Sequence, residues 1–271
     1  MNAALIGPEQ LMERLAEPQL RVIDCSFRLG KPGAGERLWL EGHIPAASFL
    51  DLDRDLAAAP GERGRHPLPE PAAFEAAARR AGVSQGSSVV AYDQAGEGGA
   101  ARLWWLLRHF GHEDVAVLDG ALTGWRAAGL PTESGEVSQT PGDFVVRSRE
   151  GDKVEIGDLE AALLLDARAP ERYRGEVEPI DAVAGHIPGA VNLPFAEIAP
   201  EGRFLPPEEL RARFETVGAG ADRPLAAYCG SGITACVVVL AAELAGVGPA
   251  RLYPGSWSEW SRRGLPVARQ Q

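Results

Sequence analysis

Residues 225–235 read Leu-Ala-Ala-Tyr-Cys-Gly-Ser-Gly-Ile-Thr-Ala, and an apolar run from 236 to 245 follows at once. The pattern predicts a buried strand that ends at Cys229, a tight loop with glycines at 230 and 232, and then a helix. Backbone N–H groups of such a loop converge on the sulfur, and together with the helix dipole they favour a thiolate. Cys229 is therefore a candidate nucleophile, although an arbitrary free cysteine is more often a small buried apolar residue.

The chain contains an internal duplication. Three pairs of segments match in order, namely 22–47 with 164–190, 89–93 with 225–229, and 119–131 with 254–266. The first pair shares an aspartate after an apolar strand and then a Gly-His-Ile-Pro turn, and the third pair shares a Gly-Leu-Pro end. A period of about half the chain is far longer than a solenoid repeat, so the sequence predicts two homologous domains in tandem.

The first copy lacks the cysteine. Asp93 stands where the second copy has Cys229, and the loop that follows it, 94–99, is longer and acidic. A carboxylate cannot act as a soft sulfur nucleophile, so this copy is expected to keep the fold without the chemistry.

The fold class predicted is α/β, with tandem duplicated domains that each hold a parallel sheet flanked by helices on both faces. The expected divisions are an N-terminal domain at 1–135, a linker at 136–148 and a C-terminal catalytic domain at 149–271. The linker overlaps the stretch 131–143, which is rich in proline, glycine, serine and threonine. Expected strands are 21–24, 88–92, 115–118, 162–166, 225–228 and 251–253. Expected helices are 8–15, 71–81, 100–109, 156–163, 207–215 and 233–245. Ligands of such folds gather at the carboxyl ends of strands, where Cys229 lies.

Composition limits the function further. A formal net charge of −11 argues against nucleic acid or an anionic membrane as a partner. No apolar run reaches the length of a membrane span, and the N-terminus lacks the pattern of a signal peptide. Three cysteines are too few and too scattered for a disulfide framework or a zinc site, so a cytoplasmic, thiol-reducing location is expected. No metal and no organic cofactor is implied.

With these residues in view, the chain resembles the two-domain rhodaneses, a family of sulfurtransferases. The resemblance covers essentially the whole length and rests on the duplicated Gly-His-Ile-Pro element, on Arg-Leu-Trp-Trp at 102–105, on Leu-Asp-Gly at 118–120 and on the Cys229 loop. Within the family, the loop Cys-Gly-Ser-Gly-Ile-Thr-Ala is similar to that of 3-mercaptopyruvate sulfurtransferases. Thiosulfate sulfurtransferases usually carry two basic residues after the cysteine, where this chain has Gly230 and Ser231.

The resemblance also implies roles for individual residues. Ser231 would act with His66 and Asp53, supplied by the first domain, as a relay that protonates the enolate of pyruvate as it leaves. Arg172 would bind the anionic end of the donor. The loop residues Gly230, Gly232, Ile233, Thr234 and Ala235 would bind and stabilise the anion that forms.

The sequence departs from the family pattern at one site position. Mercaptopyruvate enzymes usually have a second arginine shortly after a Glu-Pro pair, whereas Ile180 follows Glu178 and Pro179 here. Without the resemblance, Asp53 and His66 read as solvated residues of a surface loop, and Arg172 reads as one partner of a salt bridge to Asp166 or Glu178.

The function expected is transfer of sulfane sulfur from 3-mercaptopyruvate, through a Cys229 persulfide, to a thiol, thioredoxin or cyanide. Two alternatives stay open: a thiosulfate:cyanide sulfurtransferase of the same fold, and a rhodanese-like sulfur-relay or binding module with a protein acceptor. A phosphatase of this fold is improbable, because its loop is one residue longer and closes with an arginine, whereas position 235 is alanine.

Five other residues are expected to be structural, partly exposed or beside the site. His43 and His186 lie in Gly-His-Ile-Pro turns, where bonding of the imidazole to the backbone is favoured over catalysis. Cys236 reads as a core residue, Cys25 could be partly exposed, and Trp257 could line the active cleft.

Overall fold

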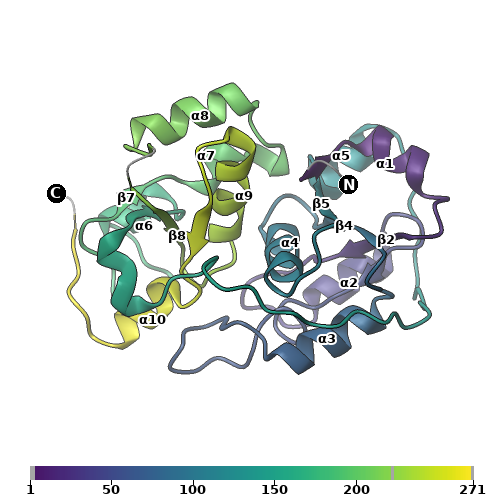
Figure 1. Ribbon diagram of the computed structural model, residues 1–271, viewed down its shortest axis with the longest axis horizontal. Coiled ribbons are helices and arrows are strands. Elements are labelled where there is room, and N and C mark those ends of the chain that lie inside the picture. The colour runs from purple at the N-terminus through teal and green to yellow at the C-terminus, as the bar shows by residue number, and fades with distance from the viewer. Residues whose placement is uncertain (1–3, 221–222, 270–271) are drawn as a thin grey trace. The chain divides into compact units, whose positions relative to one another are not determined.

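The computed structural model describes residues 4–220 and 223–269. The chain divides into two compact units, each built around its own sheet (Figure 1). The first unit comprises Met1–Ala58, Leu68–Arg149 and Glu201–Arg203. The second comprises Ala59–Pro67, Glu150–Pro200 and Phe204–Gln271. Two short segments are assigned to the unit that their position in the sequence would not suggest, namely Ala59–Pro67 to the second and Glu201–Arg203 to the first. The expected linker at 136–148 stays a prediction.

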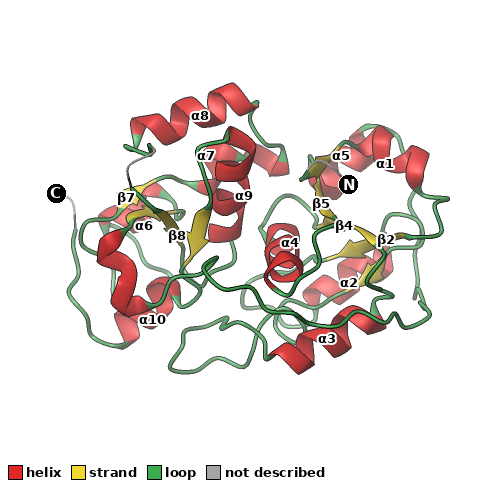
Figure 2. Cartoon of the chain, in the orientation of Figure 1, coloured by secondary structure: helices red, strands yellow, loops and turns green. Residues whose placement is uncertain are grey.

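The first unit holds a five-stranded sheet in the order β1-β5-β4-β2-β3, and every pairing in it is parallel. Its strands are β1 (Leu5–Ile6), β2 (Leu20–Asp24), β3 (Ser48–Phe49), β4 (Ser88–Tyr92) and β5 (Val115–Leu118). Its helices are α1 (Pro8–Arg14), α2 (Ala34–Glu41), α3 (Pro71–Arg80), α4 (Gly99–His109) and α5 (Ala121–Ala127). Helices alternate with strands along the chain, as Figure 2 shows, so the parallel strands are joined by helical crossovers.

The second unit holds a four-stranded parallel sheet in the order β7-β6-β8-β9. Its strands are β6 (Leu163–Asp166), β7 (Val191–Asn192), β8 (Leu225–Tyr228) and β9 (Ala250–Leu252). Its helices are the 3₁₀ turn η1 (Ile156–Ala161), α6 (Pro170–Arg174), α7 (Phe195–Ile198), α8 (Pro207–Thr216), α9 (Ala235–Ala245) and α10 (Ser256–Arg262). A further 3₁₀ turn, η2 (Pro200–Gly202), lies where the chain passes between the two units.

The duplication is preserved in the register of the central strands. Asp24 of β2 pairs with Tyr92 of β4, and Asp166 of β6 pairs with Tyr228 of β8. Both tyrosines are buried, and the backbone N–H of Ile44 or Ile187 donates to the phenolic oxygen at 3.2 Å in each unit. Each unit therefore builds the same packed core around its Gly-His-Ile-Pro turn.

The predicted fold class is confirmed, and each of the six predicted strands is present within about one residue of its expected bounds. The segment expected to be a helix at 156–163 is instead a 3₁₀ turn, and its last residue already belongs to β6. The sequence analysis missed the two-residue strands β1, β3 and β7 and the helices α2, α5, α6, α7 and α10. None of these helices exceeds eight residues, so each is too short to show a clear apolar period. Across the described ranges, no helix is both long enough and apolar enough to cross a bilayer.

Candidate active site

The candidate nucleophile lies at the carboxyl end of β8. Cys229 follows Tyr228 directly, and its side chain is only 2 % exposed. Its backbone N–H donates to the hydroxyl of Ser256 at 3.1 Å, and its carbonyl accepts from the N–H of Trp257 at 3.0 Å. The start of α10 therefore fixes the backbone of the cysteine.

The loop between β8 and α9 wraps around the sulfur. The backbone N–H of Gly232 donates to Sγ of Cys229 at 3.1 Å. Gly232 has φ +79°, and a Cβ atom at this position would lie 2.5 Å from the carbonyl oxygen of Pro254. The loop therefore needs glycine at 232 both for its conformation and for close packing against the chain before α10.

Ser231 is paired with His66. Its hydroxyl oxygen lies 2.7 Å from Nδ1 of the imidazole, and both side chains are buried. The sequence resemblance assigned His66 to the first domain, but the structure places it in Ala59–Pro67, which belongs to the second compact unit. Asp53 lies in the first unit, where its backbone N–H donates to Oδ1 of Asp51 at 2.9 Å. Its part in a relay with His66 stays a prediction.

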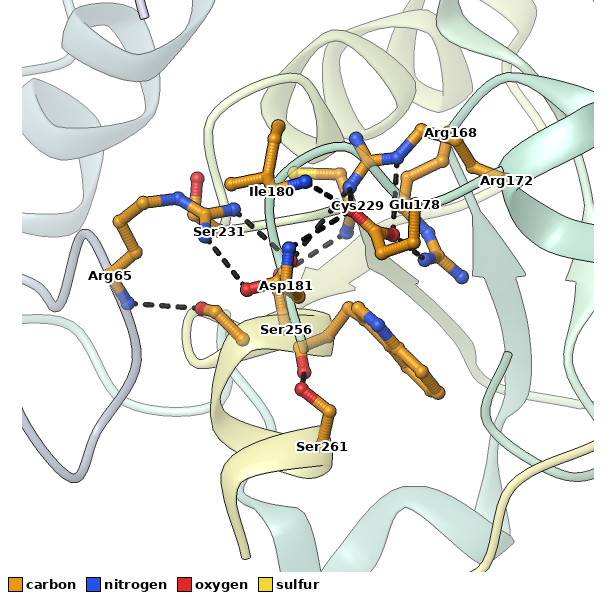
Figure 3. Close-up of polar contacts among 12 residues, drawn as sticks. Arg65, Arg168, Arg172, Glu178, Ile180, Asp181, Cys229, Ser231, Ser256 and Ser261 are labelled. Carbon is orange, nitrogen blue, oxygen red and sulfur yellow. Dashed lines mark hydrogen bonds and ion pairs between the residues drawn. The ribbon is translucent and has the colours of Figure 1, made fainter. Parts of the chain in front are cut away.

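Arg172 reaches the site from the end of α6. Its Nη2 atom donates to Oε1 of Glu178 at 2.6 Å, as in the salt-bridge interpretation, and lies 3.8 Å from Oδ2 of Asp181. The guanidinium nonetheless borders the cysteine loop, because a Cβ atom at Gly230 would be 3.6 Å from both of its terminal nitrogens. Figure 3 shows Arg172, Glu178 and Asp181 gathered beside Cys229.

Arg168 is the buried cation of this cluster. It is buried and paired with the buried carboxylate of Asp166 at 2.6 Å, and its Nη1 atom lies 3.4 Å from Glu178. Burial alone would lower the pKa of this guanidinium, but the charge of Asp166 and its hydrogen bond outweigh burial, so the pKa is raised. Arg168 is therefore a fixed cation that holds Glu178 in position for Arg172.

Sequence reasoning missed Arg65. It directly precedes His66 in the segment Ala59–Pro67. Its two terminal nitrogens donate to the two carboxylate oxygens of Asp181, at 2.8 Å and 3.4 Å. A Cβ atom at Gly230 would be 3.2 Å from its Nη2 atom, so Arg65 is as close to the loop as Arg172 is. The only local signal was a Gly-Arg-His run, which is typical of an exposed turn.

In the first unit, the side chain of Asp93 fills the loop that corresponds to the loop around Cys229. The carboxylate of Asp93 accepts backbone N–H bonds from Gly96 at 2.6 Å, Gly98 at 3.1 Å and Ala100 at 3.2 Å. Burial raises the pKa of Asp93, while these N–H bonds pull it in the opposite direction. The backbone N–H groups of this loop thus bind the carboxylate of Asp93, as expected for a domain that has lost the cysteine nucleophile.

Two histidines and two cysteines lie outside the catalytic cluster. Nδ1 of His43 bonds to the carbonyl of Trp39 at 2.8 Å and Nδ1 of His186 to that of Tyr173 at 2.7 Å, which confirms the expected backbone roles. Cys236 is buried as predicted. Cys25 is also fully buried, so its expected partial exposure was wrong.

Trp257 does not line an open cleft. Its ring is fully buried, Nε1 donates to the carbonyl of Val183 at 2.9 Å, and the guanidinium of Arg168 lies over the ring at 4.8 Å. The residue is therefore part of the core under the site. In the part of the chain that the structure describes, no group of three histidine, cysteine, aspartate or glutamate residues could hold a metal ion.

Known proteins resemble this chain over most of its length. The family model described as a rhodanese-like domain matches residues 7–128 and again residues 152–263. A Pseudomonas aeruginosa protein assigned by its name to the 3-mercaptopyruvate sulfurtransferases is 49 % identical over 96 % of this chain and 95 % of its own. A Mycobacterium tuberculosis protein whose name assigns it to the thiosulfate sulfurtransferases is 42 % identical over 89 % of this chain and 87 % of its own.

The fold is matched by a solved structure. The crystal structure of SseA from Escherichia coli, which is described as having the rhodanese fold of 3-mercaptopyruvate sulfotransferases, superposes with a TM-score of 0.82. It is 36 % identical in sequence and covers 95 % of this chain and 100 % of that one. Two family matches that together span most of the sequence, relatives above 40 % identity and this superposition lead to one conclusion: the chain belongs to the rhodanese family.

Proposed function

We propose that this chain is a sulfurtransferase that takes sulfane sulfur from 3-mercaptopyruvate and carries it as a persulfide on Cys229. The observation that carries the proposal is the cradle around the sulfur, in which Gly232 N–H meets Sγ at 3.1 Å and Ser231 is paired with His66 at 2.7 Å. The N–H of Gly232 is placed to stabilise charge on the reacting sulfur, and the serine–histidine pair can deliver a proton.

In the first half-reaction the Cys229 thiolate attacks the sulfur of the donor. A new S–S bond forms, the C–S bond breaks, and its electron pair passes to the carbon, which becomes the enolate of pyruvate. Ser231, backed by His66, supplies the proton that converts this enolate into pyruvate. The enzyme then carries one additional sulfur atom as the Cys229 persulfide.

In the second half-reaction an acceptor thiolate attacks the outer sulfur of the persulfide. The S–S bond breaks, and its electron pair returns to Cys229 as a thiolate. Thiols, thioredoxin and cyanide are acceptors of the right chemistry, and a thiol-rich compartment such as the cytoplasm suits the first two. A protein acceptor in a sulfur relay would use the same step.

Two features favour the mercaptopyruvate donor. The positions after Cys229 carry Gly230 and Ser231 rather than the two cations that would hold departing sulfite. The hydroxyl of Ser231 is also hydrogen-bonded to the imidazole of His66, an arrangement that suits proton delivery. Thiosulfate would not need this proton, because its leaving group, sulfite, departs unprotonated.

The specific observation in favour of thiosulfate is that Arg65 and Arg172 both lie beside Gly230, where a sulfonate could be bound. The Mycobacterium tuberculosis relative carries a name of that class. Thiosulfate is therefore the second candidate donor.

The test is the mass of the intact protein after brief incubation with 3-mercaptopyruvate or with thiosulfate, followed by cyanide. We expect the wild type to gain one sulfur atom that cyanide removes, and Cys229→Ser to gain none. Faster loading from 3-mercaptopyruvate would support the donor assignment, and faster loading from thiosulfate would reverse it. If neither donor loads sulfur, the enzymatic proposal is wrong and a binding or protein-relay role takes its place.

A further inference from the structure

A cavity of about 560 Å³ lies in the second unit, and none of the residues that line it belongs to the cysteine loop or to the arginine cluster beside that loop. Its lining is mainly apolar and includes Leu164, Ile187, Trp260, Leu265 and Pro266. Pockets that bind small organic molecules typically measure about 300–1,000 Å³ and have mostly apolar walls with a few polar groups. The cavity therefore has the size and the surface of a ligand site.

The first unit contains the same apolar surface, but there it is covered. The counterparts of the five lining residues are Val22, Ile44, Trp125, Leu130 and Pro131. The first four pack in one core with Leu11 of α1 and with Leu15, which directly follows that helix. Leu11 and Trp125 are both fully buried. A helix with two leucines thus fills in the first unit the space that is a cavity in the second.

The second unit lacks this helix because its chain is shorter at the corresponding place. Asp24 follows Gly7 by 17 positions, whereas Asp166 follows Gly157 by only 9. The shorter segment forms the 3₁₀ turn η1 in place of α1, and its one buried residue is Leu159. This turn does not cover the surface that α1 and its leucines cover in the first unit, so the cavity stays open to a ligand.

Trp260 offers a ligand an apolar contact. Its Nε1 atom donates to the carbonyl of Pro266 at 2.8 Å. Trp125 makes the same bond to Pro131 at 2.8 Å but is fully buried, whereas Trp260 is partly exposed. Because the only polar atom of the indole already has a partner, the exposed remainder of the ring is apolar and is best covered by an apolar group. The leucines of the first unit indicate the size of that group.

Arg223 supplies the cavity with a cation. Its Nη2 atom donates to the carbonyl oxygens of Ala162 at 2.8 Å and Glu160 at 3.5 Å, which holds the guanidinium beside the cavity that it lines. Among the described residues no carboxylate pairs with it, so its remaining N–H groups are available to an anion. Glu160 is the other charged lining residue, and its exposed carboxylate has no partner in the described ranges and can turn to water. The fixed charge of the cavity is therefore positive.

We propose that this cavity binds a small carboxylate whose apolar part is a phenyl or branched alkyl group. The apolar part lies against Trp260 and Leu164, and the carboxylate accepts N–H bonds from Arg223. A guanidinium suits this task because its fork of donors matches the two oxygens of a carboxylate. The site is separate from the one at Cys229, so its ligand does not compete with the sulfur donor.

The probe that tests this proposal is 3-phenylpropionate, compared with 3-phenylpropanol and 3-phenylpropylamine, which share its skeleton but are neutral and cationic. The readout in the full chain is the NMR resonance of the indole N–H of Trp260, identified among those of the six tryptophans by its absence in Trp260→Phe. Arg223→Gln removes the cation, and Arg251→Gln is its matched control, since Arg251 is exposed and does not line the cavity. Gly157→Phe fills the cavity, because a Cβ atom at Gly157 would have no other atom within 4 Å.

We expect 3-phenylpropionate to shift the Trp260 resonance with a dissociation constant on the order of 1 mM, as is usual for a molecule of this size. The alcohol should bind about threefold to tenfold more weakly, a modest factor because the guanidinium is exposed and screened by water, and the amine more weakly still. Arg223→Gln should weaken binding of the carboxylate by the same factor and leave binding of the alcohol unchanged. Gly157→Phe should abolish binding, and Arg251→Gln and Cys229→Ser should bind as wild type does.

Several results would overturn the proposal. If none of the three probes shifts the resonance, the cavity is not a site for small molecules of this kind. Equal affinity for the carboxylate and the alcohol would mean that the cavity does not recognise charge, and tighter binding of the amine would assign the polar contact to Glu160. Undiminished binding in Gly157→Phe would place the probe outside the cavity, and weaker binding in Cys229→Ser would place it at the nucleophile.

Discussion

Nδ1 of His66 lies 2.7 Å from the hydroxyl oxygen of Ser231, although the two residues are 165 positions apart in the chain. The serine occupies the cysteine loop, and the histidine is brought to it by a segment from the first half of the sequence that belongs to the second unit. Because a hydroxyl next to an imidazole can donate a proton and be reprotonated, the pair is suited to a leaving group that must be protonated.

Ser231→Ala should therefore affect the two donors differently. We expect loading of Cys229 from 3-mercaptopyruvate to slow by about a hundredfold, in line with the loss of one general acid. Loading from thiosulfate should change little, because sulfite leaves without a proton. The intact mass of samples quenched at set times would give both rates. Ser261→Ala is the control, because the hydroxyl of Ser261 donates to the carbonyl of Trp257 at 2.7 Å and takes no part in the serine–histidine pair. Equal slowing with both donors would contradict a proton-delivery role.

Gly232→Ala should abolish the cradle. The added methyl would lie 2.5 Å from the carbonyl oxygen of Pro254, and φ +79° disfavours any side chain, so the N–H that meets Cys229 must move. We expect a loss of more than about a hundredfold in the maximal loading rate from either donor, comparable to removal of one anion-stabilising N–H group. Gly157→Ala, where nothing lies near the added methyl, should leave the rate unchanged. Retention of wild-type loading by the Gly232 variant would show that this N–H is dispensable.

Features that depend on a few neighbouring residues were predictable from the sequence, whereas contacts between distant residues were not. The apolar runs of β4 and β8 and the glycines after Cys229 act over a few residues, so the strands and the nucleophile loop were predictable from local pattern. Arg65 and Asp181 are 116 residues apart, and neither stretch has a periodic pattern, so nothing local indicated their pairing. The short strand β3 likewise takes its form from pairing with β2 and not from its own two residues.

Arg168→Met tests the buried ion pair under the site. Removing the cation leaves Asp166, which is fully buried, without its partner at 2.6 Å, and breaking such a pair typically costs about 3–5 kcal/mol of unfolding free energy. Hydrogen exchange of peptides from β6 and β8 would report the loss within the second unit. Arg174→Met is the matched control, because Arg174 pairs with Glu176 at the surface and its loss should leave exchange unchanged. Equal protection of β6 in wild type and Arg168→Met would refute a stabilising role for the pair.

The first unit contains the same aspartate without the arginine. Ser26 stands two residues after Asp24, where the second unit has Arg168 after Asp166, and its backbone N–H donates to Oδ1 of Asp24 at 2.8 Å. Burial raises the pKa of Asp24 from 3.8 to about 6. The native state therefore binds the proton more tightly than the unfolded chain does, and ionisation of Asp24 lowers stability progressively as the pH rises from about 4 to about 6.

Asp24→Asn should consequently stabilise the first unit, and more so at neutral than at acid pH. The gain expected at pH 7.5 is on the order of 3 kcal/mol, and it should shrink as the pH falls toward 4, where the native carboxyl is already protonated. Hydrogen exchange of peptides from β2 and β4, taken as the ratio of variant to wild type at each pH, measures the effect, while β6 and β8 of the second unit serve as internal reference. A gain that is the same at both ends of this pH range would show that the variant acts through packing, and a loss of protection at pH 7.5 would show that the ionised carboxylate is stabilised by its N–H partner after all.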